Sequence, residues 1–202
     1  MTGRRVVVAL ALLGLSACGG GGDERELVGY TREPAPDVDA VALPDVSRDG
    51  APFAFRGPAG GLLIVYFGYT NCPDACPTAM ATVRGALEDL GDEAARVELA
   101  MVTIDPARDT DVLPEYVQDF VPSAHAIATD DDAALRQVAD AFGVSYDVAT
   151  RPDGEVQVGH SDHLFAVDDA GRLALTWPSG VSRDDLAADL EQLLRRRADT
   201  AP

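Results

Sequence analysis

The sequence has few basic residues for its length. Its 202 residues include 16 Lys and Arg against 34 Asp and Glu, which gives a net charge of −18 at pH 7. Proteins bind nucleic acid largely by placing Lys and Arg side chains against phosphates. The shortage of such side chains argues against nucleic acid as a partner, and the acidity is typical of a charged, solvated surface.

The chain also lacks a hydrophobic run long enough to cross a bilayer. Its N-terminal apolar run, Val6 to Leu15, is about ten residues long, whereas a membrane-spanning helix needs about 20. Arg4 and Arg5 precede this run, so residues 1–17 have the form of a secretory leader. The following Cys18 completes a Leu-Ser-Ala-Cys sequence that looks like a bacterial lipobox. We therefore expect a lipidated Cys18 and an extracytoplasmic, membrane-anchored protein of the bacterial cell envelope; an ordinary cleaved signal peptide is the alternative.

The stretch after Cys18 is rich in glycine and polar residues. Residues 18–37 include the run Gly19–Gly22 and two prolines, Pro34 and Pro36, which predicts a flexible tether. Such a tether would keep a domain over residues 38–198 near the membrane and raise its local concentration at a membrane-bound client.

Only three cysteines are present, and a lipidated Cys18 would leave the pair Cys72 and Cys76. The apolar run Leu62–Phe67 before this pair predicts a buried strand, Gly68 ends it, and a helical pattern begins after Pro73. The two thiols therefore lie where a central strand passes into a helix, the position at which open α/β folds place their chemistry.

The spacing of Cys72 and Cys76 limits what they can do. Residues four apart in a helix share one face, and a helix N-terminus favours the thiolate form of cysteine. Such a pair can be redox-active, passing between thiols and a disulfide, or it can bind one soft metal ion. A purely structural disulfide, common outside the cytoplasm, is the alternative interpretation.

The rest of the chain alternates between strand-like and helix-like patterns. We expect an N-terminal β-hairpin at Val38–Val46 and Phe53–Arg56, strands at Leu62–Phe67, Val97–Ile104, Val144–Val148, Glu155–Val158, Leu164–Asp168 and Arg172–Trp177, and helices at Thr78–Leu90, Val112–Phe120, Asp132–Phe142 and Ser182–Arg197. This order is compatible with an α/β, thioredoxin-like fold that carries an N-terminal β-hairpin and a C-terminal helix.

Four further positions could contribute to a site. Asp105 and Asp109 follow the strand at Val97–Ile104; we expect them to form turns and cap helices, with an orienting role near the thiols as the alternative. His160 lies in the loop before the strand at Leu164–Asp168, whereas His163 lies at its start. Loop placement favours His160 as a metal ligand, with His163 as its rival.

Three motifs resemble those of the Sco/SenC family, thioredoxin-fold copper proteins involved in cytochrome c oxidase assembly. They are the stretch Phe67–Pro77 with its cysteine pair, the stretch Thr103–Thr110, and His160-Ser161 followed by the strand to Asp168 and the turn at Gly171. The resemblance covers about residues 40 to 195. The chain departs from the family pattern at Gly159, where the family usually has Asp or Glu.

This resemblance implies that Cys72, Cys76 and His160 bind copper as Cu(I), Cu(II) or both. It further implies a metallochaperone that delivers copper to the CuA centre in subunit II of cytochrome c oxidase. Two thiolates and an imidazole suit copper in both oxidation states. Because a disulfide cannot bind copper, we also expect a thiol-reducing, thioredoxin-like partner.

Two other functions fit the same cysteine pair. An extracytoplasmic thiol–disulfide oxidoreductase would act on client cysteines through Cys72 and need no histidine. A thiol peroxidase would need an activated cysteine with a nearby donor, for which Arg108 is the available arginine. A requirement for His160 distinguishes a copper carrier from the oxidoreductase.

Overall fold

A computed structural model describes residues 25–200 of the chain. The expected leader over residues 1–17, the expected lipidation site Cys18 and the first part of the expected tether lie outside the described residues. Among the described residues, no helix is both long enough and apolar enough to span a membrane.

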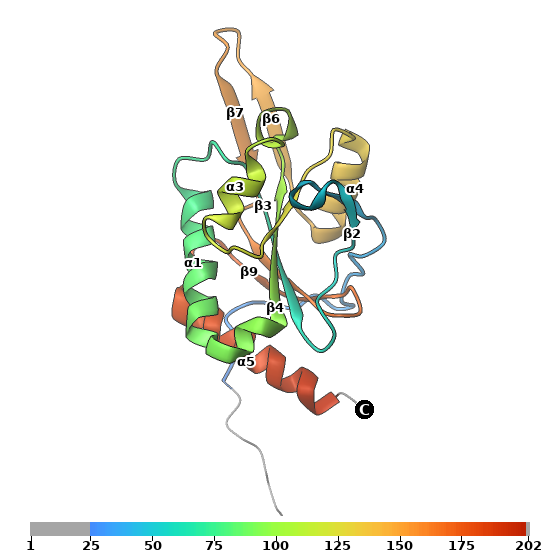
Figure 1. Cartoon of the computed structure of the whole chain (residues 1–202), viewed down its shortest axis with the longest axis vertical. Coiled ribbons are helices and arrows are strands. Elements are labelled where there is room, and N and C mark those ends of the chain that lie inside the picture. The colour runs from blue at the N-terminus through green and yellow to red at the C-terminus, as the bar shows by residue number, and fades with distance from the viewer. Residues whose placement is uncertain (1–24, 201–202) are drawn as a thin grey trace, which may run out of the picture.

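A seven-stranded mixed sheet forms the centre of the molecule (Figure 1). Its strands follow the order β2-β1-β5-β4-β3-β8-β9, in which β3, β4 and β5 run parallel and the other neighbours are antiparallel. The strands are β1 (Leu43–Asp45), β2 (Ala51–Phe53), β3 (Leu62–Gly68), β4 (Val97–Thr103), β5 (His125–Ile127), β8 (Leu164–Val167) and β9 (Leu173–Trp177). A separate antiparallel hairpin, β6 (Tyr146–Thr150) with β7 (Val156–His160), projects from one end of the molecule (Figure 1).

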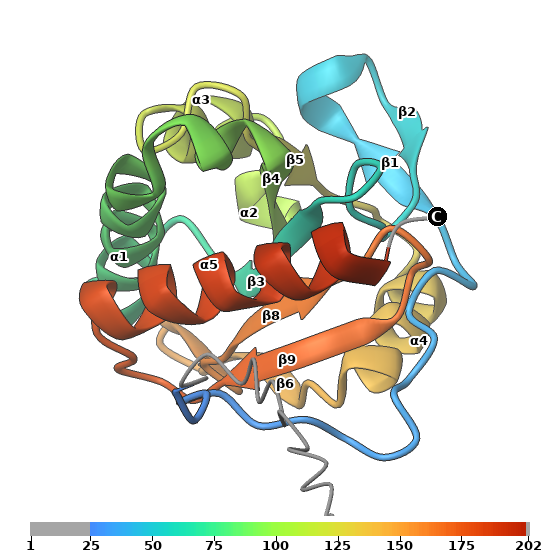
Figure 2. The same cartoon turned by 90° about the horizontal axis from the view of Figure 1, so that it is seen from below.

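Helices cover both faces of the sheet, as Figure 2 shows. The helices are α1 (Ala75–Leu90), α2 (Pro106–Asp109), α3 (Leu113–Gln118), α4 (Asp132–Phe142) and α5 (Arg183–Thr200), with short 3-10 helices at Val46–Arg48 and Gly91–Arg96. Strand β3 is buried along its whole length, so its side chains alternate between two cores. Ile64 and Tyr66 pack with α1, α3 and α5, whereas Val65 and Phe67 pack with α4.

The element order agrees with the expected thioredoxin-like α/β architecture. The N-terminal hairpin is shorter than expected, because the 3-10 helix at Val46–Arg48 and the left-handed Asp49 fill the connection between β1 and β2. The sequence patterns missed β5, whose segment was expected to be a loop. His125 begins β5 and lies largely buried, with its Nδ1 2.7 Å from an Asp45 oxygen.

Residues 25–37, which we name the strap, contradict the expectation of a free tether that extends to residue 37. The strap lies along the outer edge of β9 (Figure 2), where Tyr30 and Thr176 exchange two backbone hydrogen bonds of 2.9 Å. Val38 and Pro36 make further backbone hydrogen bonds to the turn and strand around Gly171. The tether expectation is therefore wrong for residues 25–37, because their backbone groups continue the sheet.

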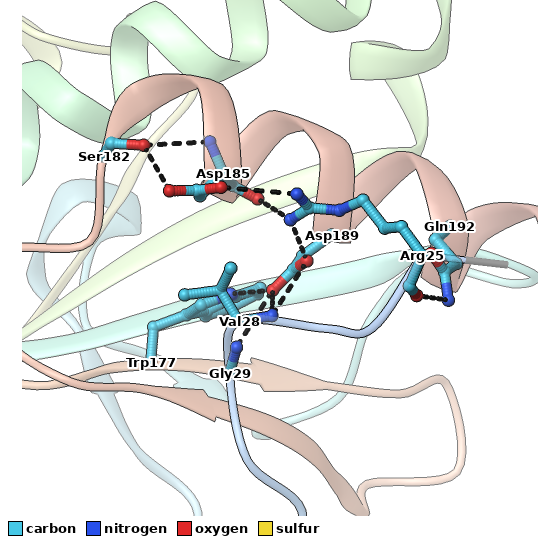
Figure 3. A network of polar contacts seen from close by, with 8 residues as sticks. All are labelled: Arg25, Val28, Gly29, Trp177, Ser182, Asp185, Asp189 and Gln192. Atoms are coloured by element: carbon cyan, nitrogen blue, oxygen red, sulfur yellow. Dashed lines mark hydrogen bonds and ion pairs between the residues drawn. The ribbon is translucent and has the colours of Figure 1, made fainter.

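A buried carboxylate holds the strap against α5 (Figure 3). Asp189 of α5 is completely buried and accepts hydrogen bonds from the backbone N–H groups of Val28 at 2.9 Å and Gly29 at 3.0 Å. The same side chain accepts from Trp177 Nε1 at 2.8 Å and from the Arg25 guanidinium at 2.5 Å. Asp189 thus joins the strap, β9 and α5.

Candidate functional site

The two cysteines lie at the junction between β3 and α1. Strand β3 ends at Gly68, a loop follows, and α1 begins at Ala75, so Cys72 lies before the helix and Cys76 lies in its first turn. The sulfur of Cys72 accepts a hydrogen bond from the backbone N–H of Cys76 at 3.3 Å. It thereby caps a helix N-terminus at which the Asp74 side chain makes no capping bond. Both cysteines are free thiols.

The two thiols have different surroundings. Cys72 is partly exposed: burial raises its pKa, but hydrogen bonds from Cys76, from the Asp74 backbone and from Tyr69 outweigh that effect and leave the pKa below its usual value. Cys76 is completely buried, and this burial, together with the neighbouring Cys72, raises its pKa to about 12. Cys72 is therefore the thiol that a solvent molecule or partner meets first.

His160 approaches Cys76 from the projecting hairpin. It is the last residue of β7, and its Nε2 lies 3.8 Å from Cys76 Sγ. Its other ring nitrogen, Nδ1, donates a hydrogen bond to the carbonyl oxygen of Ser161 at 3.0 Å. In a neutral ring this bond places the proton on Nδ1, so Nε2 keeps its lone pair and faces the sulfur. The structure therefore brings residues 84 positions apart into one site.

Two tyrosine rings enclose the imidazole. Tyr66 and Tyr69 meet the His160 ring edge to face, with centroids 6.2 Å and 5.9 Å away. The hydroxyl of the buried Tyr66 donates to Asp162 at 2.7 Å, and its burial raises its pKa far above the usual value. Sequence patterns did not identify these three residues: Tyr66 looked like an ordinary core residue of its strand, and Tyr69 and Asp162 lie in loops with no local signal.

Asp109 holds the cysteine loop to β4. This fully buried carboxylate accepts hydrogen bonds from the Thr70 backbone N–H at 2.9 Å, the Thr70 hydroxyl at 2.6 Å and the Thr103 hydroxyl at 2.7 Å. Asp105 makes no capping bond and pairs with Arg108. The expected turn at a helix start is present at Asp105, which is the N-cap residue of α2 and whose carbonyl accepts from the N–H groups of Arg108 and Asp109 at 3.1 Å. The expectation of capping is wrong for Asp109, whose side chain bonds Thr70 and Thr103. At Asp109 the alternative, an orienting role near the thiols, agrees with the contacts.

His163 has other neighbours. Its ring lies beside Phe165, and it lines a cavity of about 320 Å³ between the start of α1 and the loop after β9. Met80 of α1 is completely buried in the core and is not available as a ligand at the surface of the site. Within residues 25–200, no three His, Cys, Asp or Glu side chains are already arranged to hold a metal ion. Cys76 and His160 are thus in contact, and a third ligand would have to move toward them to complete a metal site.

Comparisons with known proteins agree with this architecture. The sequence model described as SCO1/SenC matches residues 45–195. A SCO2-like protein of Rickettsia prowazekii is 31% identical over 130 residues, which cover 63% of each chain. A Stutzerimonas stutzeri protein, named as a candidate copper-binding protein, is 30% identical over 147 residues, 72% of this chain and 68% of its own. The solution structure of apo Sco1 from Thermus thermophilus superimposes with a TM-score of 0.68 at 29% identity, and covers 89% of this chain and 100% of its own.

Proposed function

The chain belongs to the SCO1/SenC family, and we propose that it is a copper metallochaperone in which Cys72, Cys76 and His160 bind the ion. We further propose that it is anchored outside the cytoplasm through a lipid on Cys18 and hands copper to the CuA centre in subunit II of cytochrome c oxidase. Its relative in Stutzerimonas stutzeri, named as a candidate copper-binding protein, and the family resemblance of its motifs support this assignment.

The observation that carries the proposal is the 3.8 Å separation of Cys76 Sγ and His160 Nε2. A tetrahedral ion that binds sulfur at about 2.3 Å and nitrogen at about 2.0 Å, as zinc does, holds the two atoms about 3.5 Å apart. The observed pair needs a movement of only a few tenths of an ångström to reach that spacing. Cys72 would complete the set by turning its sulfur away from the Cys76 N–H.

The donor set suits a carrier. Thiolates favour Cu(I), and an imidazole allows Cu(II) as well. Three protein ligands leave an open position at which a ligand of the client can enter, and the partly exposed Cys72 is the ligand that the client reaches first. Because copper binding requires thiols, a thiol-reducing, thioredoxin-like partner would keep the pair reduced outside the cytoplasm.

A copper titration of the reduced full chain in detergent tests this assignment. We expect Cys76→Ser to abolish tight binding and His160→Ala to weaken it and change the copper absorption spectrum. His163→Ala is the matched control, because the ring of His163 packs beside Phe165 and leaves the Cys76 contact to His160. Undiminished affinity in Cys76→Ser, or an unchanged spectrum in His160→Ala, would contradict the proposal.

The second candidate is a thiol–disulfide oxidoreductase. The observation that favours it is the difference in exposure: Cys72 is partly exposed at a helix N-terminus, while Cys76 is buried behind it. An attacking thiol and a resolving thiol need this arrangement. An insulin-reduction assay separates the two functions, because an oxidoreductase keeps its rate in His160→Ala and a copper carrier shows no rate that depends on either cysteine.

A further inference from the structure

We propose that Asp162 is a positioning residue for His160. Its carboxylate fixes the chain just after the histidine to the central sheet, and so holds the imidazole against Cys76. This inference rests on the proposed role of His160 as a copper ligand, and it adds a residue to which neither the motifs nor the comparisons assign a role.

The first observation is that His160 lies on an element with few ties to the sheet. The hairpin β6–β7 forms its own two-stranded sheet, and it projects beyond the seven-stranded sheet (Figure 1). At its base, Ser161 N donates to the Ser145 carbonyl at 2.9 Å, which joins the segment to the residue before β6. Tyr146 and Val158 of the hairpin pack on the α4 side of the sheet, which is the face opposite α1. The backbone of the hairpin alone therefore does not determine where the imidazole lies relative to α1.

The second observation is that Asp162 adds side-chain bonds between the histidine segment and the main domain. One carboxylate oxygen accepts from the Tyr66 hydroxyl on β3 at 2.7 Å, and the other accepts from the Ser179 hydroxyl after β9 at 2.5 Å. Each oxygen has one donor, and the donors come from two elements of the main domain. Because Asp162 is two residues after His160, these bonds restrict the position of the whole segment.

The third observation is that the link ends on a residue that contacts the site. The Tyr66 ring meets the His160 ring edge to face, and Tyr66 is also a neighbour of Cys76, because a side chain added at Gly68 would touch both of them. Asp162 therefore holds the histidine segment to Tyr66, the residue against which His160 and Cys76 both pack.

The orientation of the imidazole follows from the same anchor. His160 Nδ1 donates to the carbonyl of Ser161, which lies between His160 and Asp162 in the chain. A movement of Asp162 would rotate that peptide and turn Nε2 away from Cys76. Groups that orient a metal-binding histidine in this way commonly contribute about 10- to 100-fold to metal affinity.

The test compares variants of the full chain in two states. With Cu(II) added to the reduced protein, we expect Asp162→Ala and Tyr66→Phe each to lower copper affinity at least about tenfold and to weaken the nitrogen hyperfine coupling in electron paramagnetic resonance. In the metal-free protein, we expect the same variants to lose the nuclear Overhauser contact between the ring of His160 and the ring at position 66.

Two controls separate positioning from stability. Asp168→Ala removes a buried carboxylate at the other end of β8, and should lower the melting temperature without changing the nitrogen coupling or the ring contact. Ser179→Ala leaves the Tyr66 bond in place and should keep the ring contact. If Asp162→Ala keeps the nitrogen coupling and ring contact of the wild type, or if Asp168→Ala changes them equally, the proposal is overturned. Failure of the wild type to bind copper would refute the proposed function, while the metal-free ring contact would still test Asp162.

Discussion

The clamp at Asp189 allows a quantitative prediction about stability. In Asp189→Ala the buried indole N–H of Trp177 loses its acceptor, which costs about 1–3 kcal/mol. The backbone N–H groups of Val28 and Gly29 lose their bonds to a charged acceptor and return to water only if the strap leaves the domain. Together these losses should lower the free energy of unfolding by about 3 kcal/mol.

Three measurements test the predicted destabilisation of Asp189→Ala. A loss of about 3 kcal/mol corresponds to a melting temperature about 6–12 °C lower in a domain of this size. Trp177 is the one tryptophan in the chain, so its emission reports directly on the clamp, and we expect a shift to longer wavelength in the variant. Trypsin should cleave after Arg25 and Arg32 faster in the variant than in the wild type.

The control for this variant is Asp185→Ala. Asp185 also bonds Arg25 but lies on the exposed side of α5, so its loss should change stability far less than the loss of Asp189. The reasoning would be refuted if Asp189→Ala cost less than about 1 kcal/mol and left both the emission and the cleavage pattern unchanged. In that case the strap would be held by its backbone pairing to β9 alone.

Three further predictions concern the site. Cys72 should be alkylated by iodoacetamide at a lower pH than an ordinary thiol, because its lowered pKa gives thiolate earlier as the pH rises. Cys76 should stay unmodified until the pH approaches its pKa of about 12. Mass spectrometry of the two cysteine peptides measures both reactions. Gly68→Ala should weaken copper binding, because the new Cβ would lie 3.0 Å from Cys76 Sγ and 2.6 Å from the Tyr66 ring. Asp109→Ala should free Thr70 and speed hydrogen exchange at its amide, with the remainder of the sheet unchanged.

The strength of the local pattern explains which elements the sequence predicted. Helix α4 has the predicted bounds Asp132–Phe142, since a strong apolar face, an aspartate cap and Gly143 all agree locally. The buried strands β3 and β4 differ from prediction by a single residue at their C-terminal ends. Strand β5 has only three residues and exists because β4 and β1 pair with it, so no local pattern could identify it.

The strap is a second element that local sequence patterns could not predict. Its glycine, proline and charged residues are typical of a linker, and the partner that fixes it, Asp189, lies 160 residues away from Gly29 in the chain. Within the site, the position of the cysteine pair followed from a strand, a glycine and a helix start. The approach of His160 to Cys76 depends on the direction in which the β6–β7 hairpin projects. No local pattern predicts that direction, so the choice of His160 rested on its loop placement and on the family resemblance.

The acidity of the chain, interpreted from sequence as a solvated surface, is partly internal. Asp109, Asp162 and Asp189 each join segments that are far apart in sequence, and every contact given above for them is one in which a carboxylate oxygen accepts from a hydroxyl, an N–H or a guanidinium. An ionised carboxylate has two acceptor oxygens and no donor, so it can satisfy donors from several elements at once. Asparagine at position 109 or 162 could turn its amide N–H toward a hydroxyl, which can also accept, whereas asparagine at position 189 would turn an amide N–H toward N–H groups that cannot. The cost should be greatest at Asp189, because that side chain is fully buried and both of its oxygens face N–H groups, so an isosteric amide cannot replace the carboxylate that holds the strap.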